Sequence, residues 1–314
     1  MGREGWELVL LLLGVLVLDT YGFALATGRG TGRATWGMSV ERVGFSFTPG
    51  GLLFPYHLGV AKALQEGRFL TDCTPIAGSS AGALTCAVLG CDLDLQDMVS
   101  VSSELCQDCR EGGTRYRLRD VVHSSLDKFL PEDAHHRINN RRGEVSIAIT
   151  HLNPLPRGEF VSSFHSRHDL IEVLLGSCCV PWWFARTPTL RVRGKPTMDG
   201  VFAVPRKQFG APDITTCEQV VRVSVFPHST WPMESKVAGD LISPDLLGGH
   251  LKYRFLELLN YALNPAPDDK LEELFTMGWK TGHLWMAQFG QHYQGSNTQD
   301  PVGRANPLIE SAVA

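Results

Sequence analysis

The sequence predicts an α/β fold of three layers (α/β/α), with helices on both sides of a mostly parallel central sheet. Short runs of β-branched and aromatic residues alternate along the chain with segments whose apolar residues recur at helical spacing. This alternation is typical of parallel sheets whose strands are connected by helices. The composition agrees, because 43% of the 314 residues are hydrophobic and 20% are charged, which is ordinary for a globular protein with a substantial core.

Each expected element follows from its local pattern. Runs rich in β-branched, aromatic or small apolar residues predict strands at residues 43–47, 75–78, 144–150 and 220–226. Apolar residues at helical spacing, or a run of small apolar residues, predict helices at residues 55–66, 81–89, 250–263 and 270–285. A glycine-rich turn follows the first strand, and a proline-rich segment at 264–267 separates the last two helices.

The composition divides the chain into three parts. Residues 1–39 are expected to be a targeting segment and linker, residues 40–290 the folded domain, and residues 291–314 a loose polar tail. The apolar run 8–18 is too short to cross a bilayer, which needs about 20 residues. Its length suits a signal peptide, with an A-x-A cleavage pattern at residues 24–26.

Two destinations remain open for this targeting segment. Residues 27–39 carry basic and hydroxyl side chains but no acid, a composition typical of transit peptides. A signal followed by such a stretch resembles the two-part address of complex plastids in algae, with Phe23 near the cleavage point. The alternative is a plain secretory signal and a linker. The acidic Glu4 and Glu7 also leave a short membrane anchor open. We therefore expect a membrane-associated protein that enters the secretory pathway or a complex plastid.

Net charge and cysteine spacing argue against two classes of function. The formal net charge is −4, so the overall charge gives no reason to expect nucleic-acid binding. Cys106 and Cys109 form a single C-x-x-C pair without a second pair at zinc spacing, so no metal site is expected. Arg115, Arg117 and Arg119 form a local basic cluster, which is either a solvated face or a patch for anionic lipid headgroups.

The strongest local signal is a G-x-S-x-G motif formed by Gly78, Ser80 and Gly82. A strand-like segment precedes the motif and a helix-like segment of small residues follows it, as around a nucleophile turn. In such a turn the serine backbone is strained, and the two glycines let the strand and the helix approach closely. The hydroxyl then lies at the amino end of the helix. We therefore expect Ser80 to be a nucleophile and Ser79, at a variable position, to be structural.

With its neighbouring motifs, this segment resembles the patatin-like phospholipase family. The shared features are a strand, a glycine turn, a helix, a second strand that enters G-x-S-x-G, the segment 178–184, and the step Asp199-Gly200. The resemblance covers roughly residues 42–228. It implies a patatin-like fold with a Ser-Asp dyad and no histidine, in which Ser80 is the nucleophile and Asp199 is the base.

Each member of the implied dyad has a chemical task. A serine hydroxyl is a weak nucleophile until a base accepts its proton, and Asp199 would accept that proton directly. A carboxylate with the reference pKa of about 3.9 is a weak base, so we expect the site to raise this pKa or to orient the transfer tightly. Gly200 is expected to let the backbone pass close to Ser80. The alternative for Asp199-Gly200 is an ordinary turn.

The resemblance also implies an oxyanion hole in the glycine turn after the first strand. Its expected donors are the backbone N–H groups of Gly50, Gly51 and Leu52. Such donors typically contribute about 3 kcal/mol each to transition-state stabilisation. The glycine turn is therefore the third part of the expected site.

Departures from the family's glycine-rich box leave three functions open. Pro49 lacks an N–H group, and Leu53 and Phe54 stand where the family usually has a basic residue and a glycine. The leading hypothesis is a serine hydrolase without metal or cofactor that cleaves long-chain acyl esters of phospholipids, triacylglycerols or galactolipids at a membrane or lipid-droplet surface. A transacylase would use the same acyl-serine intermediate. A catalytically silent lipid-binding module would keep only the fold.

Other residues have structural alternatives to a role in the site. His57 either faces the site or is packed in, or exposed on, its helix. The aromatic segment 182–184 is expected in the core, with an acyl-chain pocket as the alternative. The adjacent Cys178 and Cys179 are expected to be small core residues.

Overall fold

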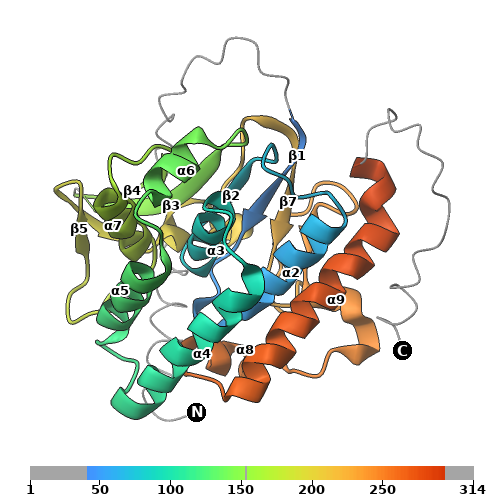
Figure 1. Ribbon diagram of the computed structural model, residues 1–314. Helices are drawn as coiled ribbons and strands as arrows, with labels where there is room; N and C mark the ends of the chain where they lie inside the picture. Colours follow the sequence, from blue (N-terminus) through green and yellow to red (C-terminus); the bar gives the residue numbers. More distant parts are fainter. Residues whose placement is uncertain (1–40, 153, 294–314) are drawn as a thin grey trace.

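The computed structural model describes residues 41–152 and 154–293 (Figure 1). The expected targeting segment, 1–39, and most of the expected tail, 291–314, lie outside the described residues. The centre of the structure is an eight-stranded sheet in the order β5-β6-β3-β2-β1-β7-β8, with β4 paired to β3 beside this path. The strands are β1 (Glu41–Phe47), β2 (Ile76–Gly78), β3 (Val145–Leu152), β4 (Pro156–Val161), β5 (Leu190–Val192), β6 (Lys195–Met198), β7 (Cys217–Val223) and β8 (Leu241–Ile242).

The sheet is mostly parallel. Strand β1 pairs in parallel with β2 and β7, β2 pairs with β3, and β7 pairs with β8. Antiparallel pairing is confined to one side of the sheet, where β3 pairs with β4 and β6, and β6 pairs with β5. The carboxyl ends of the parallel strands therefore meet at one edge, which is where open α/β sheets bind their ligands.

Helices flank this sheet. The α-helices of the described part are α2 (Phe54–Glu66), α3 (Ala81–Gly90), α4 (Leu95–Gly112), α5 (Leu118–Phe129), α6 (Ala134–Asn140), α7 (Arg167–Ser177), α8 (Phe255–Leu263) and α9 (Asp268–Tyr293). The 3-10 helices are η2 (Gly51–Leu53), η3 (Gly200–Ala203), η4 (Arg206–Gln208) and η5 (Pro244–His250). None of the helices described is long and apolar enough to cross a membrane.

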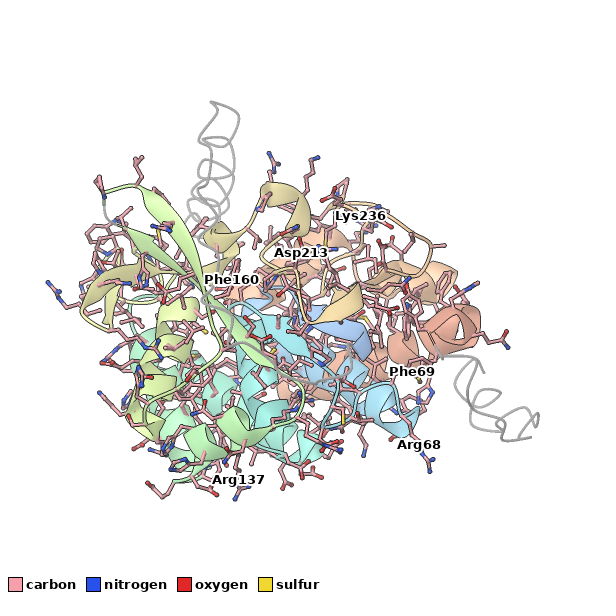
Figure 2. All side chains as sticks on the ribbon, turned by 90° about the horizontal axis from the view of Figure 1, so that it is seen from above. Arg68, Phe69, Arg137, Phe160, Asp213 and Lys236 are labelled. Atoms are coloured by element: carbon pink, nitrogen blue, oxygen red, sulfur yellow. The ribbon has the colours of Figure 1, made fainter. Side chains whose placement is uncertain are left out.

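Different elements pack against the two faces of the sheet. In Figure 1 the helices α2, α3, α4 and α9 lie in front of the strands. Seen from above in Figure 2, Arg137 of α6 lies on one side of the molecule, whereas Asp213, between η4 and β7, and Lys236, between β7 and β8, lie on the other. Helix η3 packs on β3 and β4. The predicted α/β class, a mostly parallel sheet flanked by helices, is confirmed.

Strand β7 begins and ends earlier than the sequence predicts. Strand β7 covers Cys217–Val223, whereas residues 220–226 were expected. Phe226 N–H donates a hydrogen bond of 3.2 Å to Ser224 Oγ, and the Ser224 hydroxyl donates to the Phe226 carbonyl oxygen at 2.9 Å. This local side-chain bonding turns the chain at Ser224 and so ends the strand.

The two helices near the carboxyl end also differ in length from the prediction. Helix α8 begins at Phe255 rather than at residue 250, and the Glu257 carboxylate caps it by accepting a hydrogen bond of 2.8 Å from Arg254 N–H. Helix α9 continues to Tyr293, beyond the expected end at residue 285 and past the expected start of the tail at 291.

Helices α2 and α9 lie side by side along much of their length (Figure 1). A Cβ atom at Gly59 would lie 2.0 Å from the Phe275 carbonyl oxygen, and one at Gly278 would lie 2.0 Å from the Tyr56 carbonyl oxygen. The two backbones are therefore in direct contact at these glycines. Because α2 starts directly after the glycine turn, this contact also holds the turn in place.

We expect Gly278→Ala to lower the free energy of unfolding by about 1–3 kcal/mol, because the new methyl group must push α9 away from α2. At an exposed helix position the same change would raise the free energy of unfolding by about 1 kcal/mol. The expected decrease therefore comes from the close contact between the helices. Thr276→Ala, on the exposed side of α9, is the control and should leave the midpoint of urea unfolding almost unchanged. Equal midpoints for Gly278→Ala and the wild type would show that the helices do not touch there.

Candidate active site

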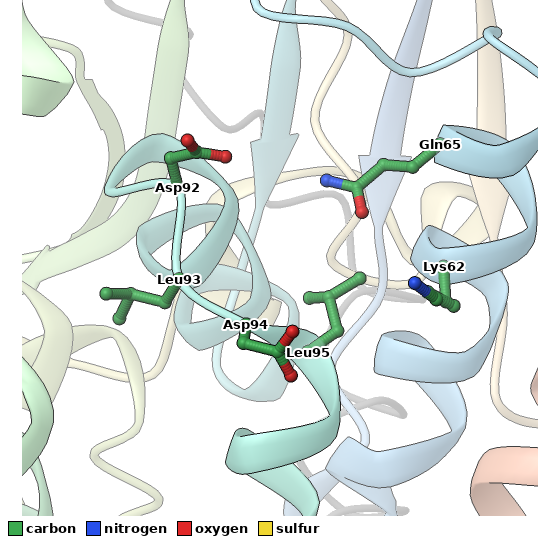
Figure 3. Close-up of a pocket in the computed structure, with 6 residues that line it drawn as sticks. All are labelled: Lys62, Gln65, Asp92, Leu93, Asp94 and Leu95. Carbon is green, nitrogen blue, oxygen red and sulfur yellow. The ribbon is translucent and has the colours of Figure 1, made fainter.

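Two shallow surface pockets among the described residues do not contain the residues that the sequence singles out. One pocket of about 240 Å³ is lined by Lys62 and Gln65 of α2 and by residues 92–95, which lead from α3 into the first residue of α4 (Figure 3). The other, of about 270 Å³, lies between α2 and α9 and includes Phe275 and Trp279. Both adjoin the carboxyl-terminal half of α2, whereas the glycine turn precedes its amino end. The candidate site residues lie instead in the segments that directly follow strands β1, β2 and β6.

Ser80 occupies the sharp turn between β2 and α3. Its φ of 52° and ψ of −123° lie outside the helical and extended regions, as expected for a nucleophile turn. The neighbouring glycines make this turn possible. A Cβ atom at Gly78 would lie 2.5 Å from the Gly82 carbonyl oxygen, and one at Gly82 would lie 2.2 Å from the Phe47 carbonyl oxygen. Here β1, β2 and α3 touch through main-chain atoms.

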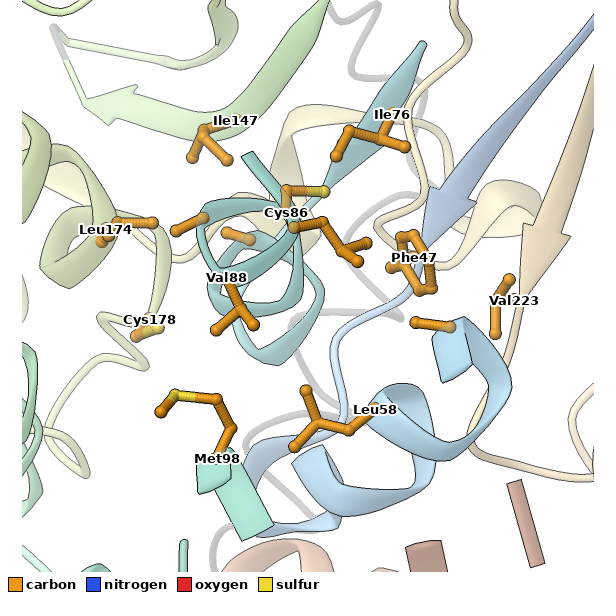
Figure 4. Close-up of a cluster of buried hydrophobic side chains, with 14 of the residues drawn as sticks. Phe47, Leu58, Ile76, Cys86, Val88, Met98, Ile147, Leu174, Cys178 and Val223 are labelled. Atoms are coloured by element: carbon orange, nitrogen blue, oxygen red, sulfur yellow. The ribbon is translucent and has the colours of Figure 1, made fainter. Parts of the chain in front are cut away.

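Buried apolar side chains hold α3 against the sheet. Cys86 and Val88 of α3 are fully buried and lie among side chains from the strands and from α2 and α4 (Figure 4). The labelled neighbours in Figure 4 include Phe47, Ile76, Ile147, Val223, Leu58 and Met98. Burying one such large side chain stabilises by about 1.5–3 kcal/mol, whereas a strained backbone residue costs about 1–3 kcal/mol. A few of these contacts therefore offset the strain at Ser80.

A buried serine on α7 binds the nucleophile turn. Ser80 N–H donates a hydrogen bond of 2.9 Å to Ser177 Oγ, and the Ser177 hydroxyl donates to the Ala148 carbonyl oxygen at 2.7 Å. The turn is thereby joined to α7 and β3. Because Ser177 occupies the Ser80 N–H, that group is not available to an oxyanion. Ser177 was not among the site residues expected from the sequence, since a lone serine at a helix end forms no recognisable motif.

Asp199 follows β6 and lies level with the nucleophile turn. Both β2 and β6 pair with β3. When their pairing registers are extended, Ser80 and Asp199 both lie opposite Ile149 of β3. Asp199 N–H donates to the Cys179 carbonyl oxygen at 2.8 Å, and the Asp199 carbonyl oxygen accepts from the Thr150 hydroxyl at 2.8 Å. These bonds fix the backbone of Asp199 and leave its carboxylate free for other contacts. Thr150 and Cys179 were not anticipated as positioning residues.

Gly200 brings this segment close to the nucleophile turn. A Cβ atom at Gly200 would lie 2.2 Å from the Ala148 carbonyl oxygen and 2.8 Å from Ser79 Cβ. Ser79 itself is fully buried, and no hydrogen bond to its hydroxyl is present among the described groups. The side chain of Ser79 thus packs against the Asp199-Gly200 step.

Burial controls the charge of Asp199. The residue is 1% exposed, and loss of solvent raises the pKa of its carboxyl group to about 7, against smaller opposite effects of the Val201 N–H and the Ser80 hydroxyl. Val201 N–H donates to Oδ1 at 2.8 Å, while Oδ2 has no hydrogen-bond partner of normal geometry in the described part of the chain. The Ser80 hydroxyl stabilises the ionised carboxylate, although no Ser80–Asp199 hydrogen bond of normal geometry is present in the described part. Such catalytic hydrogen bonds often tighten only when substrate binds.

The glycine turn after β1 presents three unoccupied donors beside this pair. Within residues 41–152 and 154–293, no backbone hydrogen bond uses the N–H groups of Gly50, Gly51 or Leu52, whereas Leu53 N–H donates to the Gly50 carbonyl oxygen at 3.1 Å. A Cβ atom at Gly82 would lie 2.8 Å from the carbonyl oxygen of Thr48, so the turn adjoins the amino end of α3. The three N–H groups expected as oxyanion donors are thus unoccupied, in a turn that adjoins the helix beginning after Ser80.

A buried histidine holds this turn. His57 is fully buried on α2, and its Nε2–H donates to the Thr48 carbonyl oxygen at 2.8 Å. Thr48 N–H donates to the Val223 carbonyl oxygen at 3.0 Å, so Thr48 is bound to both α2 and β7. Burial lowers the pKa of His57 to about 4, and the neutral ring adds no charge to the site. The interpretation of His57 as a packed helix residue is confirmed, and this packing positions the turn.

The residues that depart from the family's glycine box have structural roles. Leu53 is fully buried in the main core, Phe54 packs against that core, and Leu52 belongs to a small cluster between α4 and α9. Gly51 has φ +54°, and a Cβ atom there would lie 2.2 Å from the Ala262 carbonyl oxygen of α8. Only glycine fits this position. The departures therefore change the side chains around the turn but leave its backbone donors in place.

The cysteines near the site are buried, protonated thiols. Cys178 and Cys179 are buried, as expected, and burial together with the Asp199 carboxylate raises the pKa of both, that of Cys179 to about 12. Burial also raises the pKa of Cys106 and Cys109. No group of three or more His, Cys, Asp or Glu side chains in the described ranges is arranged to hold a metal ion.

The aromatic segment after α7 is divided between core and surface. Trp183 and Phe184 are buried as expected, but Trp182 is 51% exposed, so its prediction as a core residue is wrong. Trp182 has φ +59°, and its N–H donates to the Thr187 carbonyl oxygen at 3.3 Å. The turn closed by this bond directs Trp182 outward, which an unbroken apolar run in the sequence does not reveal.

A family model described as patatin-like phospholipase matches residues 46–209. This range is more than half of the 314 residues. It begins in β1, ends directly after η4, and contains the glycine turn, Ser80 and Asp199.

Several curated proteins are similar to this chain. Patatin-like phospholipase domain-containing protein 4 from Homo sapiens is 28% identical over 253 residues, which cover 76% of this chain and 94% of that protein. A 1-acylglycerol-3-phosphate O-acyltransferase from Mus musculus is 30% identical over 264 residues, covering 80% of this chain and 60% of that protein. An omega-hydroxyceramide transacylase from Homo sapiens is 28% identical over 166 residues, covering 50% of this chain and 30% of that protein. The matched part thus spans nearly all of the first relative and a smaller share of the other two.

Among solved structures, the crystal structure of VipD from Legionella pneumophila is similar to this chain. The two share 13% sequence identity, with a TM-score of 0.47. The match covers 82% of this chain and 68% of that chain.

We expect Asp199→Asn to be more stable than the wild type at about pH 8, by about 2–4 kcal/mol. Asparagine keeps an acceptor for the Val201 N–H but removes a buried charge. Because folding raises the pKa of Asp199 from 3.8 to about 7, the wild type loses stability as the pH rises through this interval, whereas the variant does not. Urea unfolding at about pH 4 and about pH 8 measures the difference, which should shrink at the lower pH. An equal difference at both pH values would contradict the raised pKa.

Proposed function

The chain belongs to the patatin-like phospholipase family, and we propose that it is a serine hydrolase that cleaves acyl esters of lipids with Ser80 and Asp199. One observation carries the proposal: the strained Ser80 turn lies at the carboxyl edge of the sheet, level with a buried carboxylate. Family membership supports action on lipid acyl groups in general. The dyad and the substrate class are proposals.

In the first step Ser80 Oγ attacks the ester carbonyl carbon while the Asp199 carboxylate accepts the hydroxyl proton. With a pKa of about 7, Asp199 is a stronger base than an exposed aspartate, so the proton transfer is less unfavourable. The former carbonyl oxygen carries the negative charge of the tetrahedral intermediate. When the C–O bond to the alcohol breaks, protonated Asp199 returns its proton to the leaving alcohol, and the acyl group remains on Ser80.

In the second step water attacks the acyl-serine ester. Asp199 accepts a proton from this water, the bond between the acyl carbon and Ser80 Oγ breaks, and Ser80 Oγ receives the proton from Asp199. The products are a fatty acid and an alcohol, which for a phospholipid is the lysophospholipid. The steps need only side chains, backbone donors and water.

The glycine turn would stabilise both tetrahedral intermediates. The N–H groups of Gly50, Gly51 and Leu52 are not used within the described fold, and loss of one such donor costs about 10²–10³ in kcat in other serine hydrolases. These donors favour an enzyme over the catalytically silent lipid-binding module that the altered glycine box leaves open. Pro49 removes one N–H group, but three remain.

A transacylase is the second candidate. Two similar proteins are named as an acyltransferase and a transacylase, and the alcohol of a second lipid could replace water in the second step without any change to the dyad. For either reaction we propose a long-chain phospholipid, triacylglycerol or galactolipid at a membrane or lipid-droplet surface. The proposed compartment, secretory or plastid, depends on residues 1–39, outside the described part.

A fluorophosphonate probe tests the nucleophile. We expect the probe to label the wild type and Ser79→Ala but not Ser80→Ala, because only the Ser80 hydroxyl lies in the strained turn beside Asp199. Labelling is measured by mass spectrometry of the intact, folded protein. Failure to label well-folded wild type would reject the hydrolase and favour the silent lipid-binding module.

The rate of ester hydrolysis should rise with pH along a limb with an apparent pKa near 7, because only ionised Asp199 accepts the serine proton. His57, with a pKa of about 4, does not titrate in this interval. Asp199→Asn should lower kcat by orders of magnitude and remove the limb. We would measure kcat/KM on a soluble p-nitrophenyl ester between about pH 5 and about pH 9. Wild-type rates in Asp199→Asn would remove Asp199 from the mechanism.

A further inference from the structure

Two connections at the carboxyl edge of the sheet meet in a cluster of arginine and aromatic side chains. Arg115 and Tyr116 come from the connection between α4 and α5, and Trp182, Trp183 and Arg186 come from the connection between α7 and β5. We call these five residues the arginine–aromatic patch. None of them belongs to the dyad or to the glycine turn.

Backbone hydrogen bonds join the two connections. Tyr116 N–H donates to the Trp183 carbonyl oxygen at 2.7 Å, and Arg119 N–H donates to the Phe184 carbonyl oxygen at 2.9 Å. Trp183 is buried and Trp182 is 51% exposed. The patch is therefore a fixed surface whose buried tryptophan holds the exposed one in place.

Two bulky aromatic residues of the patch have left-handed backbones. Tyr116 has φ 68° and Trp182 has φ 59°, and this conformation costs about 1–2 kcal/mol for a residue with a side chain. Exposure of Trp182 also forfeits the stabilisation that burial of such a ring would bring. The turn that the Thr187 carbonyl oxygen closes therefore holds Trp182 outward at the cost of backbone strain and of an exposed ring. Strain kept at a surface residue points to a function.

Two guanidinium groups converge on one ring. The Cζ atoms of Arg115 and Arg186 lie 4.8 Å and 5.2 Å from the centre of the Tyr116 ring, so the two cations are at most about 10 Å apart. Arg186 is exposed and forms no ion pair with a carboxylate in the described part of the chain. By contrast, Arg117 and Arg119 are paired with Asp108 and Asp120. At Arg186 an anion would meet positive charge that no carboxylate of the described part neutralises.

The patch lies near the dyad. The Cys179 carbonyl oxygen accepts the Asp199 N–H, and Trp182 follows Cys179 by three residues, a reach of at most about 10 Å. A surface that binds this patch would therefore lie beside the opening of the site.

We propose that the arginine–aromatic patch docks the enzyme on a phospholipid membrane. Arg186, beside Arg115 on the Tyr116 ring, binds a lipid phosphate group, since guanidinium donors match phosphate oxygens. Trp182 inserts at the level of the headgroups, where tryptophan is favoured. The lipid nature of the partner rests on the proposed function, whereas the position of the patch does not.

Vesicle sedimentation with the full chain tests this docking surface. We expect tighter binding to phosphatidylcholine vesicles that contain phosphatidylserine than to phosphatidylcholine alone, because the arginines attract an anionic surface. Trp182→Ala and Arg186→Glu should each weaken binding to the anionic vesicles by about tenfold or more. The matched controls Val237→Ala and Lys236→Glu change exposed residues just before β8. Strand β8 is the outermost strand on the side of the sheet away from β5, so both variants should bind like the wild type.

A soluble substrate separates this proposal from the proposed function. Trp182→Ala and Arg186→Glu should hydrolyse a soluble p-nitrophenyl ester, and react with fluorophosphonate, at wild-type rates. Unchanged vesicle binding in both variants would overturn the docking surface, as would a joint loss of vesicle binding, ester hydrolysis and thermal stability. Vesicle binding needs no turnover, so an inactive wild type that still binds through Trp182 and Arg186 would reject only the hydrolase.

Discussion

The candidate site depends on the direct contact of three main chains at Ser80. Because Gly82 of α3 lies against the Phe47 carbonyl oxygen of β1, and Gly78 lies against Gly82, the serine between them has no room for a relaxed backbone. The strain is supported by the buried side chains around α3 and by the hydrogen bond from Ser80 N–H to Ser177. A larger residue at either glycine would separate α3 from β1 and move the hydroxyl away from Asp199.

Burial gives the surrounding groups their protonation states. The same loss of solvent that raises the pKa of Asp199 to about 7 lowers that of His57 to about 4 and keeps the nearby thiols of Cys178 and Cys179 protonated. Asp199 is therefore the one group among these four that changes charge near neutral pH. A single titrating carboxylate beside a serine suits a dyad in which one residue both accepts and returns the proton. His57 contributes through position, by holding Thr48 and the glycine turn.

Local patterns predicted the elements that carry the site, but not all of the fold. The strand before Ser80 and the helix after it follow from G-x-S-x-G and its apolar neighbours, since their sterics are local. Helices α4 to α7 were not assigned, although α4 carries a usable signal: Leu95, Met98, Val99 and Ser102 are buried at helical spacing. Its first turn is also capped by Asp94, which accepts hydrogen bonds from two N–H groups.

By itself the sequence determined the α/β class and the sharp turn at Ser80, because turn sterics and strand or helix periodicity depend on neighbours along the chain. Asp199 as the expected partner of Ser80 came from the resemblance to the family. Only the tertiary structure decided which backbone donors are free, how strongly burial shifts the pKa of Asp199, and that Trp182 faces outward. These properties depend on residues far apart in the sequence. The bond from Ser80 to Ser177 spans 97 positions, and no local pattern near Ser80 encodes it.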